Sequence, residues 1–196
     1  MDRRILKTRS VIKKSLTSLM KEKPFDKITI KDITDKANIN RATFYLHYMD
    51  KYDLLEQSQN DILNEIREVL ADAFKIFNPQ SLPIQDATTI IPFLSCVYEC
   101  IGKNSDFVKV ILGGNGDLNF HLKFKSLIEE LIKKISVIKT PDAFCIPLKY
   151  LIETATSMHI GIISRWLEDG MVETPYELAC ITSNIIVSIS NSVIKN

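Results

Sequence analysis

Apolar residues recur at helical spacing along nearly the whole chain. Within residues 3–22, Ile5, Ile12, Leu16 and Leu19 lie on one stripe, and lysines and arginines occupy the opposite side. This spacing of three to four residues predicts an amphipathic helix. Pro24 ends it, because proline disfavours the helical conformation in the residue before it. We find no internal repeat, no low-complexity tract and no convincing strand pattern, so the predicted fold class is all-α.

The next segment has the spacing of a helix-turn-helix. Thr29-Ile-Lys-Asp32 is a capping box, which begins a second helix. Asn38 tolerates the left-handed conformation that a tight turn requires, and Asn40 can cap a third helix. Residues 1–50 are therefore predicted to form a three-helix head, in which the third helix turns Phe44 and Tyr48 inward.

Beyond the head, the pattern predicts a connector and a helical body. Asp50 caps a fourth helix over about 51–77, which serves as the connector, and residues 78–196 form the body. Asn-Pro and Leu-Pro pairs within 78–83 break the chain. GGNGD at 113–117 is interpreted as a turn between helices. Body helices are expected near 85–101, 104–112, 119–138, 146–169 and 174–194.

Charge is unevenly distributed between head and body. Residues 1–52 contain 13 Lys+Arg and 6 Asp+Glu, a balance of 13 − 6 = +7, whereas the remainder contains 12 and 18, a balance of −6. A basic head on an acidic body suggests that the head binds a polyanion.

Other chemistry is not expected. No nucleophile elbow or paired catalytic constellation occurs, so the chain is predicted not to be an enzyme and to need no cofactor. Cys96 and Cys100 share a helix face and could bind a metal or sense oxidation, but buried free thiols are the simpler interpretation, so no metal site is predicted. The chain shows no secretory signal and no span of ~20 apolar residues, so a cytoplasmic protein without membrane association is expected.

The second helix of a helix-turn-helix lies in the major groove with its first residues on the base edges. Arg41 could bind a guanine, although it could also be a solvated residue, and Ala42 or the Thr43 methyl could contact a thymine methyl. Side chains that can donate hydrogen bonds to phosphate come after these base-reading residues. The cations of the first helix form a solvated face that adds a diffuse attraction to DNA. The candidate phosphate donors are Tyr45, His47 and Lys51, although Tyr45 could merely cover the surface of the head and His47 could be an ordinary half-buried histidine. The first-helix cations are Lys7, Arg9, Lys13 and Lys14.

The stretch ITIKDITDKANINRATFYLHYMDKYDLL, residues 28–55, resembles the TetR family of bacterial transcriptional regulators. The family pattern is a Thr-capped helix, a tight turn, a short helix with Tyr-x-His-aromatic and a Lys that opens the next helix. The resemblance implies that this motif contacts DNA. The sequence departs from the family pattern at two positions. Asn38 stands where Gly is usual, and Asn40 where Ser or Thr is common. The predicted DNA-binding residues are Thr29, Asn40, Arg41, Ala42, Thr43, Tyr45, His47 and Lys51.

The resemblance also implies partners: a double-stranded DNA operator, a second copy of the chain and a small-molecule effector that releases a repressor. GIISRWLEDGMVETPYELA, residues 161–179, resembles the C-terminal region of some members. The alternative is a protein of this fold that acts through a protein partner rather than DNA. The expected interface residues are Ile160, Ile163, Leu167, Ile181, Ile185 and Ile189, although these apolar stripes could instead face only the chain's own core. The candidate pocket residues, each of which could instead be an ordinary core residue, are Phe93, Tyr98, Phe107, Phe120, His121, Phe124, Tyr150, Met158 and Trp166.

Overall fold

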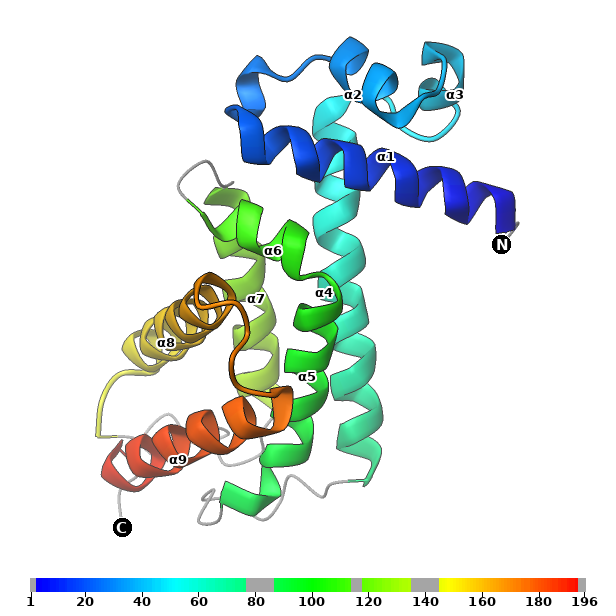
Figure 1. The fold of residues 1–196 in the computed structure, drawn as a ribbon. Helices are drawn as coiled ribbons and strands as arrows, with labels where there is room; N and C mark the ends of the chain where they lie inside the picture. The colour runs from blue at the N-terminus through cyan, green and yellow to red at the C-terminus, as the bar shows by residue number, and fades with distance from the viewer. Residues whose placement is uncertain (1–2, 77–86, 114–117, 135–144, 194–196) are drawn as a thin grey trace. The chain divides into compact units, whose positions relative to one another are not determined.

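The structure is a computed structural model that describes residues 3–76, 87–113, 118–134 and 145–193. Every regular element within these ranges is a helix, which confirms the all-α prediction (Figure 1). In chain order the elements are α1 (Arg3–Glu22), the 3-10 helix η1 (Phe25–Lys27), α2 (Ile30–Ala37), α3 (Arg41–Tyr45), α4 (Lys51–Ile76), the 3-10 helix η2 (Ala87–Thr89), α5 (Ile91–Lys103), α6 (Ser105–Leu112), α7 (Leu118–Lys134), α8 (Leu148–Glu168) and α9 (Pro175–Val193).

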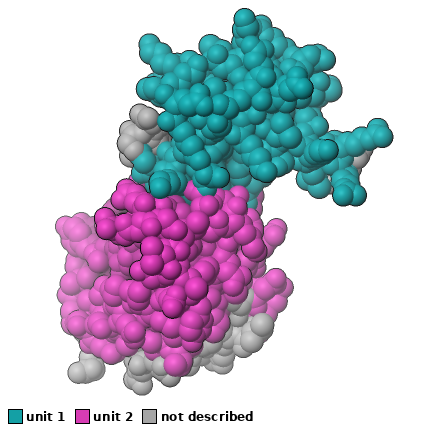
Figure 2. All heavy atoms as spheres, in the orientation of Figure 1, with its two compact units in different colours: residues 1–62, 106–117 teal, residues 63–105, 118–196 magenta. Residues whose placement is uncertain are grey.

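The chain divides into two compact units (Figure 2). Unit 1 contains residues 1–62 and 106–117, and unit 2 contains residues 63–105 and 118–196. This division differs from the expected domains at two places: it cuts α4 within the predicted connector, and it groups α6 with the N-terminal helices.

The core of unit 1 follows from the apolar stripes of its helices. Ile12 and Leu16 of α1, Ile33 of α2, Phe44 of α3 and Leu54 of α4 are each 0% exposed. Helix α1 packs against α2, and α2 packs against α3. Burying a side chain of this size stabilises the fold by about 1.5–3 kcal/mol, so these residues hold the short helix α3 in place.

Helix α6 joins unit 1 through two contacts with α1. The Lys21 ammonium forms an ion pair with the carboxylate of Asp106. Nearer the start of α1, the Lys13 ammonium lies 4.8 Å from the centre of the Phe107 ring. Phe107 itself is buried. A cation over an aromatic face is attracted by the ring quadrupole, so an ion pair and a cation–π contact join α1 to α6.

In unit 2, α5 packs along α9 and α7 packs against α8. The buried hydroxyl of Tyr98 on α5 donates to the Thr182 hydroxyl on α9 at 2.8 Å. The Trp166 indole lies 6.0 Å from the Tyr98 ring and donates to the Glu173 carbonyl at 2.8 Å. These contacts fix aromatic side chains in the interior of the body.

The expected body helices are present, with shifted ends. Helix α5 begins at Ile91, six residues later than expected, with a proline in its first turn. Helix α8 ends as predicted before Gly170, which has φ +82°, and Thr174 caps α9 by accepting from the Glu177 amide at 3.3 Å. The predicted breaks at 78–83 and 114–117 and the predicted helix end at 135–138 lie outside the described residues. None of the described helices is long and apolar enough to cross a membrane.

Candidate nucleic-acid interface

The predicted capping box at the start of α2 is confirmed. The Thr29 hydroxyl accepts from the Asp32 amide at 3.1 Å, and the Thr29 amide donates to the Asp32 carboxylate at 2.8 Å. Lys23 also donates to this carboxylate, at 2.9 Å. The hydrogen bond from Lys23, followed by those from Thr29, holds the pKa of Asp32 far below its usual range. The Thr29 hydroxyl also donates to Asp32, so its polar atoms serve the cap in this structure.

The turn between α2 and α3 has the predicted conformation. Asn38 has φ 52° and ψ 48°, in the left-handed region. Its amide donates to the Asp35 carbonyl at 3.2 Å, and the Ile39 amide donates to the Thr34 carbonyl at 3.1 Å. These two hydrogen bonds are those of a Schellman motif, which satisfies the last carbonyls of α2. The departure from Gly therefore preserves the turn.

Asn40 caps α3, as predicted. Its side-chain oxygen accepts from the Thr43 amide at 2.7 Å and from the Thr43 hydroxyl at 2.8 Å. The Thr43 hydroxyl is thus turned toward the cap. Asn40 and Thr43 fix the first turn of α3, whose neighbouring residues Arg41 and Ala42 are exposed.

Helix α3 has one buried and one exposed face. Phe44 is 0% exposed, and Tyr48, just beyond the helix, is 4% exposed, which confirms that both are core residues. On the opposite side Tyr45 is 55% exposed and Leu46 is 81% exposed. His47 lies between the two faces and is half-buried. Leu46 was missed by the sequence analysis, although its place four residues after Ala42 extends the exposed face.

A polar network joins α1 to the end of α3 and the start of α4. Arg9 donates to the Tyr48 hydroxyl at 3.2 Å and to the Gln57 side-chain oxygen at 2.8 Å. Gln57 donates to Asp53 at 2.8 Å, and Asp53 accepts from the Met49 amide at 2.8 Å. The prediction that Arg9 belongs to a solvated face is therefore wrong. Its pKa is raised by the hydrogen bond with Tyr48, so the guanidinium stays charged in the network.

Asp50 caps α4, as predicted, by accepting from the Tyr52 and Asp53 amides at 2.8 Å each. The side chain of Lys51 has partners that the sequence did not suggest. Its ammonium donates to the Phe25, Asp26 and Ile28 carbonyls at 3.1, 3.0 and 2.8 Å. An ammonium has three hydrogens, and the three backbone carbonyls occupy all of them in this structure.

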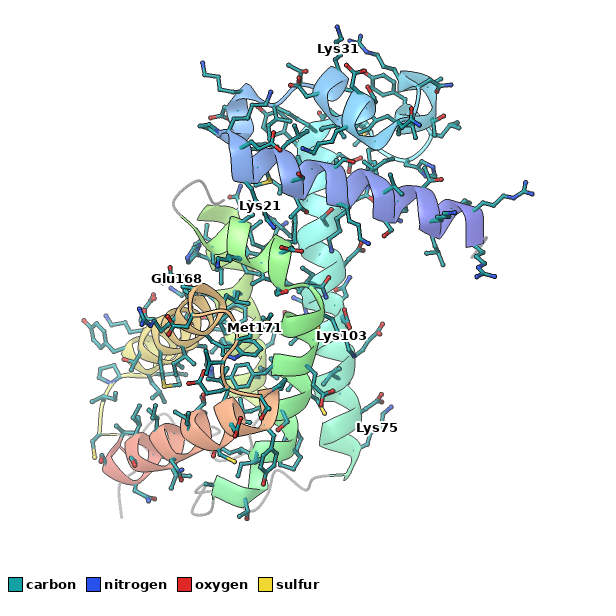
Figure 3. The ribbon with its side chains drawn as sticks, viewed as in Figure 1. Lys21, Lys31, Lys75, Lys103, Glu168 and Met171 are labelled. Atoms are coloured by element: carbon teal, nitrogen blue, oxygen red, sulfur yellow. The ribbon has the colours of Figure 1, made fainter. Side chains whose placement is uncertain are left out.

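Several other cations of unit 1 are exposed. Lys31 points away from α2 into solvent (Figure 3), and Lys7 and Lys14 of α1 are exposed, as expected. Lys13 is half-buried over the Phe107 ring, so its share of the predicted solvated face is small. The cations available to a polyanion are thus spread over α1, α2 and α3.

In the body, the predicted pocket residues do not share one environment. Phe107 is 3% exposed and belongs to unit 1, which corrects its placement in a body pocket. Tyr150 is 56% exposed on α8. The remaining residues stay predictions. Of these, Tyr98, Phe120, Phe124 and Trp166 are buried, and Phe93, His121 and Met158 are half-buried.

The predicted interface residues also differ in burial. Ile163 and Leu167 are each 3% exposed within the single chain, so they pack in its own core and their assignment to an interface is wrong. The sequence could not separate the two faces of α8, because apolar residues occur on both. Ile181 and Ile185 are exposed by 47% and 38%, and Ile160 and Ile189 are half-buried.

The cysteines are free thiols. Cys100 is buried and Cys96 is exposed, although they share a helix. Among the described residues, no group of three or more His, Cys, Asp and Glu side chains is placed to hold a metal ion. Burial lowers the pKa of His159 to about 4, so this imidazole is neutral near pH 7.

The capped α2, the tight turn and the exposed short helix α3 on a basic unit define a helix-turn-helix regulator. A profile described as "Bacterial regulatory proteins, tetR family" matches residues 14–57. A second profile, "Transcriptional regulator C-terminal region" of the TetR type, matches residues 88–188. The chain belongs to the TetR family of transcriptional regulators, which are DNA-binding regulators rather than enzymes.

Individual relatives agree with this assignment. The uncharacterized HTH-type transcriptional regulator YxbF of Bacillus subtilis (strain 168) is 30% identical over 132 residues, which are 66% of this chain and 33% of that protein. The chain thus spans about a third of the length of this curated relative.

Solved structures share the fold. A TetR transcriptional regulator from Streptococcus agalactiae 2603V has a TM-score of 0.62 at 24% identity, over 94% of this chain and 96% of that one. A putative TetR-family transcriptional regulator from Syntrophomonas wolfei has a TM-score of 0.63 at 18% sequence identity, over 94% of this chain and 95% of that one. The dihydroxyacetone kinase operon activator DhaS has a TM-score of 0.55 at 20% sequence identity, over 96% of this chain and 98% of that one.

Proposed function

We propose that this protein is a homodimeric cytoplasmic repressor that binds a DNA operator and is released by a small-molecule effector. The observation that carries the proposal is the exposed face of α3, where Arg41, Ala42 and Tyr45 project from a helix held on Phe44. An exposed aromatic, a cation and a methyl on a fixed short helix suit a duplex groove.

The roles within the groove follow from the side chains. Arg41 can donate two hydrogen bonds to a guanine, and Ala42 can contact a thymine methyl. The Thr43 hydroxyl donates to Asn40, so its methyl is the group left for bases. The Tyr45 phenol and the His47 imidazole are donors to phosphate oxygens. Arg41 thus carries sequence preference, whereas Tyr45 and His47 set the position on the backbone.

Dimerisation is supported by the surfaces of α8 and α9. Ile181 and Ile185 are exposed one helical turn apart on α9. On α8, Ser157 and Gly161 are exposed at the same spacing, and an added Cβ at Gly161 would meet nothing within 4 Å. Small residues on one helix and branched apolar residues on another allow two copies to approach closely in a helical bundle.

An effector site is supported by polar atoms in the body. The Ser95 hydroxyl and the Nδ1 atom of His121 are buried and have no hydrogen-bond partner among the described residues. Buried polar atoms without partners cost free energy, and a ligand that bonds to them recovers it. An effector with hydrogen-bonding groups and an apolar body suits this interior.

DNA binding is tested by fluorescence anisotropy with the DNA that flanks the protein's own gene. Tyr45→Ala should weaken binding about tenfold or more, as expected when a contact worth about 1.4 kcal/mol or more is lost. Tyr176→Ala is the matched control, since Tyr176 is 62% exposed but lies on α9. Equal affinities of the two variants would contradict the role of α3. Recovery of a stable protein complex, with no DNA binding at low salt, would favour the protein-partner alternative.

The dimer is tested by light scattering coupled to size exclusion. Ile181→Glu should shift the protein toward monomer, because it places a charge in the proposed interface. Leu122→Glu is the control, since Leu122 is 57% exposed on α7. If both variants keep the mass of the wild type, the interface lies elsewhere.

The direction of regulation is tested with a reporter gene behind the same DNA. Deleting the regulator should raise expression, and adding the effector should do the same while the regulator is present. A fall in expression on deletion would identify an activator, the activity named for the structural relative DhaS.

A further inference from the structure

We infer that Lys51 is a positioning residue: it ties the start of α2 to the start of α4, sets the orientation of the helix-turn-helix and makes no phosphate contact itself. The inference rests on the proposed DNA binding and assigns to this lysine a different role from the one that the sequence suggested.

The first support is the geometry around the ammonium. Its three hydrogen bonds, to the Phe25, Asp26 and Ile28 carbonyls, have lengths between 2.8 and 3.1 Å. The same nitrogen lies 4.9 Å from the centre of the Phe25 ring and 5.2 Å from that of Tyr52. The two rings meet edge to face at 5.4 Å. The cation is thus enclosed by three acceptors and two aromatic faces.

The backbone carbonyls and a DNA phosphate would compete for the Lys51 ammonium, which is the second support. A phosphate contact would require the ammonium to leave at least one carbonyl, and the carbonyl left behind would lose a charge-assisted hydrogen bond. Ile28, which supplies the shortest of these bonds, is 1% exposed. Its carbonyl lies next to the residue that caps α2. Moving the ammonium from the Ile28 carbonyl to a solvated phosphate would therefore cost free energy, because little water can reach this buried residue.

The third support is the place of the tie in the chain. Ile28 directly precedes the cap of α2, and Lys51 is the first residue of α4. Residues 29–50 between them contain the whole helix-turn-helix. The hydrogen bond from Lys51 to Ile28 therefore joins the two ends of this segment, as a short cross-link would. Loosening it lets α2 and α3 rotate as a pair against α4, which moves Arg41 and Tyr45 together.

The experiment measures DNA affinity of the full chain against salt concentration, at a temperature where all variants are folded by circular dichroism. Lys51→Met keeps the aliphatic stem and loses the ammonium. Lys31→Met is the matched control, because Lys31 is exposed on α2 (Figure 3). Phe25→Leu is a second variant, which removes one ring and leaves the charge of the head unchanged.

Lys51→Met should weaken binding about tenfold or more, because base and phosphate contacts are displaced together. Its slope of log affinity against log salt should stay within about 0.5 of the wild type, since loss of a phosphate contact would change that slope by about 0.9. Phe25→Leu should weaken binding in the same direction, again without a change in slope. Lys31→Met should weaken it less than Lys51→Met.

Three outcomes would overturn the inference. A slope lowered by about one in Lys51→Met would show a direct phosphate contact. Binding by Lys51→Met equal to that of Lys31→Met would show that only the net charge matters. Unchanged binding by Phe25→Leu would show that the enclosure does not position the head. Failure of the wild type to bind at low salt would instead overturn the proposed function, and the inference with it.

Discussion

Replacing Arg9 by Met tests whether the polar network between α1 and α4 stabilises the head. The change keeps the aliphatic stem and removes the hydrogen bonds to Tyr48 and Gln57, of 3.2 and 2.8 Å. A hydrogen bond to a charged group contributes about 1.5–3 kcal/mol. The Arg9 side chain is 25% exposed, so water replaces part of the interaction. We therefore expect a loss of about 2 kcal/mol in the free energy of unfolding.

For a chain of this size, a loss of about 2 kcal/mol lowers the melting temperature by about 4–8 °C. Differential scanning calorimetry at equal protomer concentration measures it, because a dimer's melting temperature depends on concentration. Lys14→Met is the control, since Lys14 is exposed on the same helix. A double-mutant cycle with Gln57→Leu isolates the pair. If Arg9→Met melts within about 1 °C of Lys14→Met, the network does not stabilise the head in the way argued.

Three further changes have defined outcomes. Asn40→Ala should lower the free energy of unfolding by about 1 kcal/mol through loss of the α3 cap, measured by urea denaturation. Tyr98→Phe should cost about 1 kcal/mol in the same assay, because the buried hydrogen bond to Thr182 is lost. The lowered pKa of Asp32 contributes stability above its unfolded pKa of about 4 that is lost as pH falls further. Wild-type protein should therefore lose more stability than Asp32→Asn between about pH 4 and pH 2, and equal losses would show that Asp32 contributes nothing.

Local signals in the sequence were sufficient for the helix-turn-helix. The caps at Thr29 and Asn40 and the left-handed turn at Asn38 depend on residues within a few positions of each other. Periodicity likewise predicted that Phe44 and Tyr48 face inward. Each of these features is decided by the backbone and by near neighbours, so a single sequence contains the information.

Long-range polar contacts could not be predicted. Arg9 and Lys51 are ordinary exposed cations by spacing, and only the fold brings Tyr48 to the first and the Phe25–Ile28 carbonyls to the second. A lysine is also long enough to reach either solvent or a backbone acceptor from the same Cα position. The interface prediction for Ile163 and Leu167 was wrong for a related reason. The apolar spacing of α8 does not show whether a residue contacts its own chain or a second copy.

The membership of α6 in unit 1 affects how the protein is made. During synthesis residues 63–105 must leave the ribosome after residues 1–62 and before residues 106–117 can join them. Until then Lys13 and Lys21 lack Phe107 and Asp106, and the nascent head has an uncovered side. The product of a gene truncated after α4 would lack α6 permanently. A fragment designed to bind DNA by itself should therefore extend through residue 117.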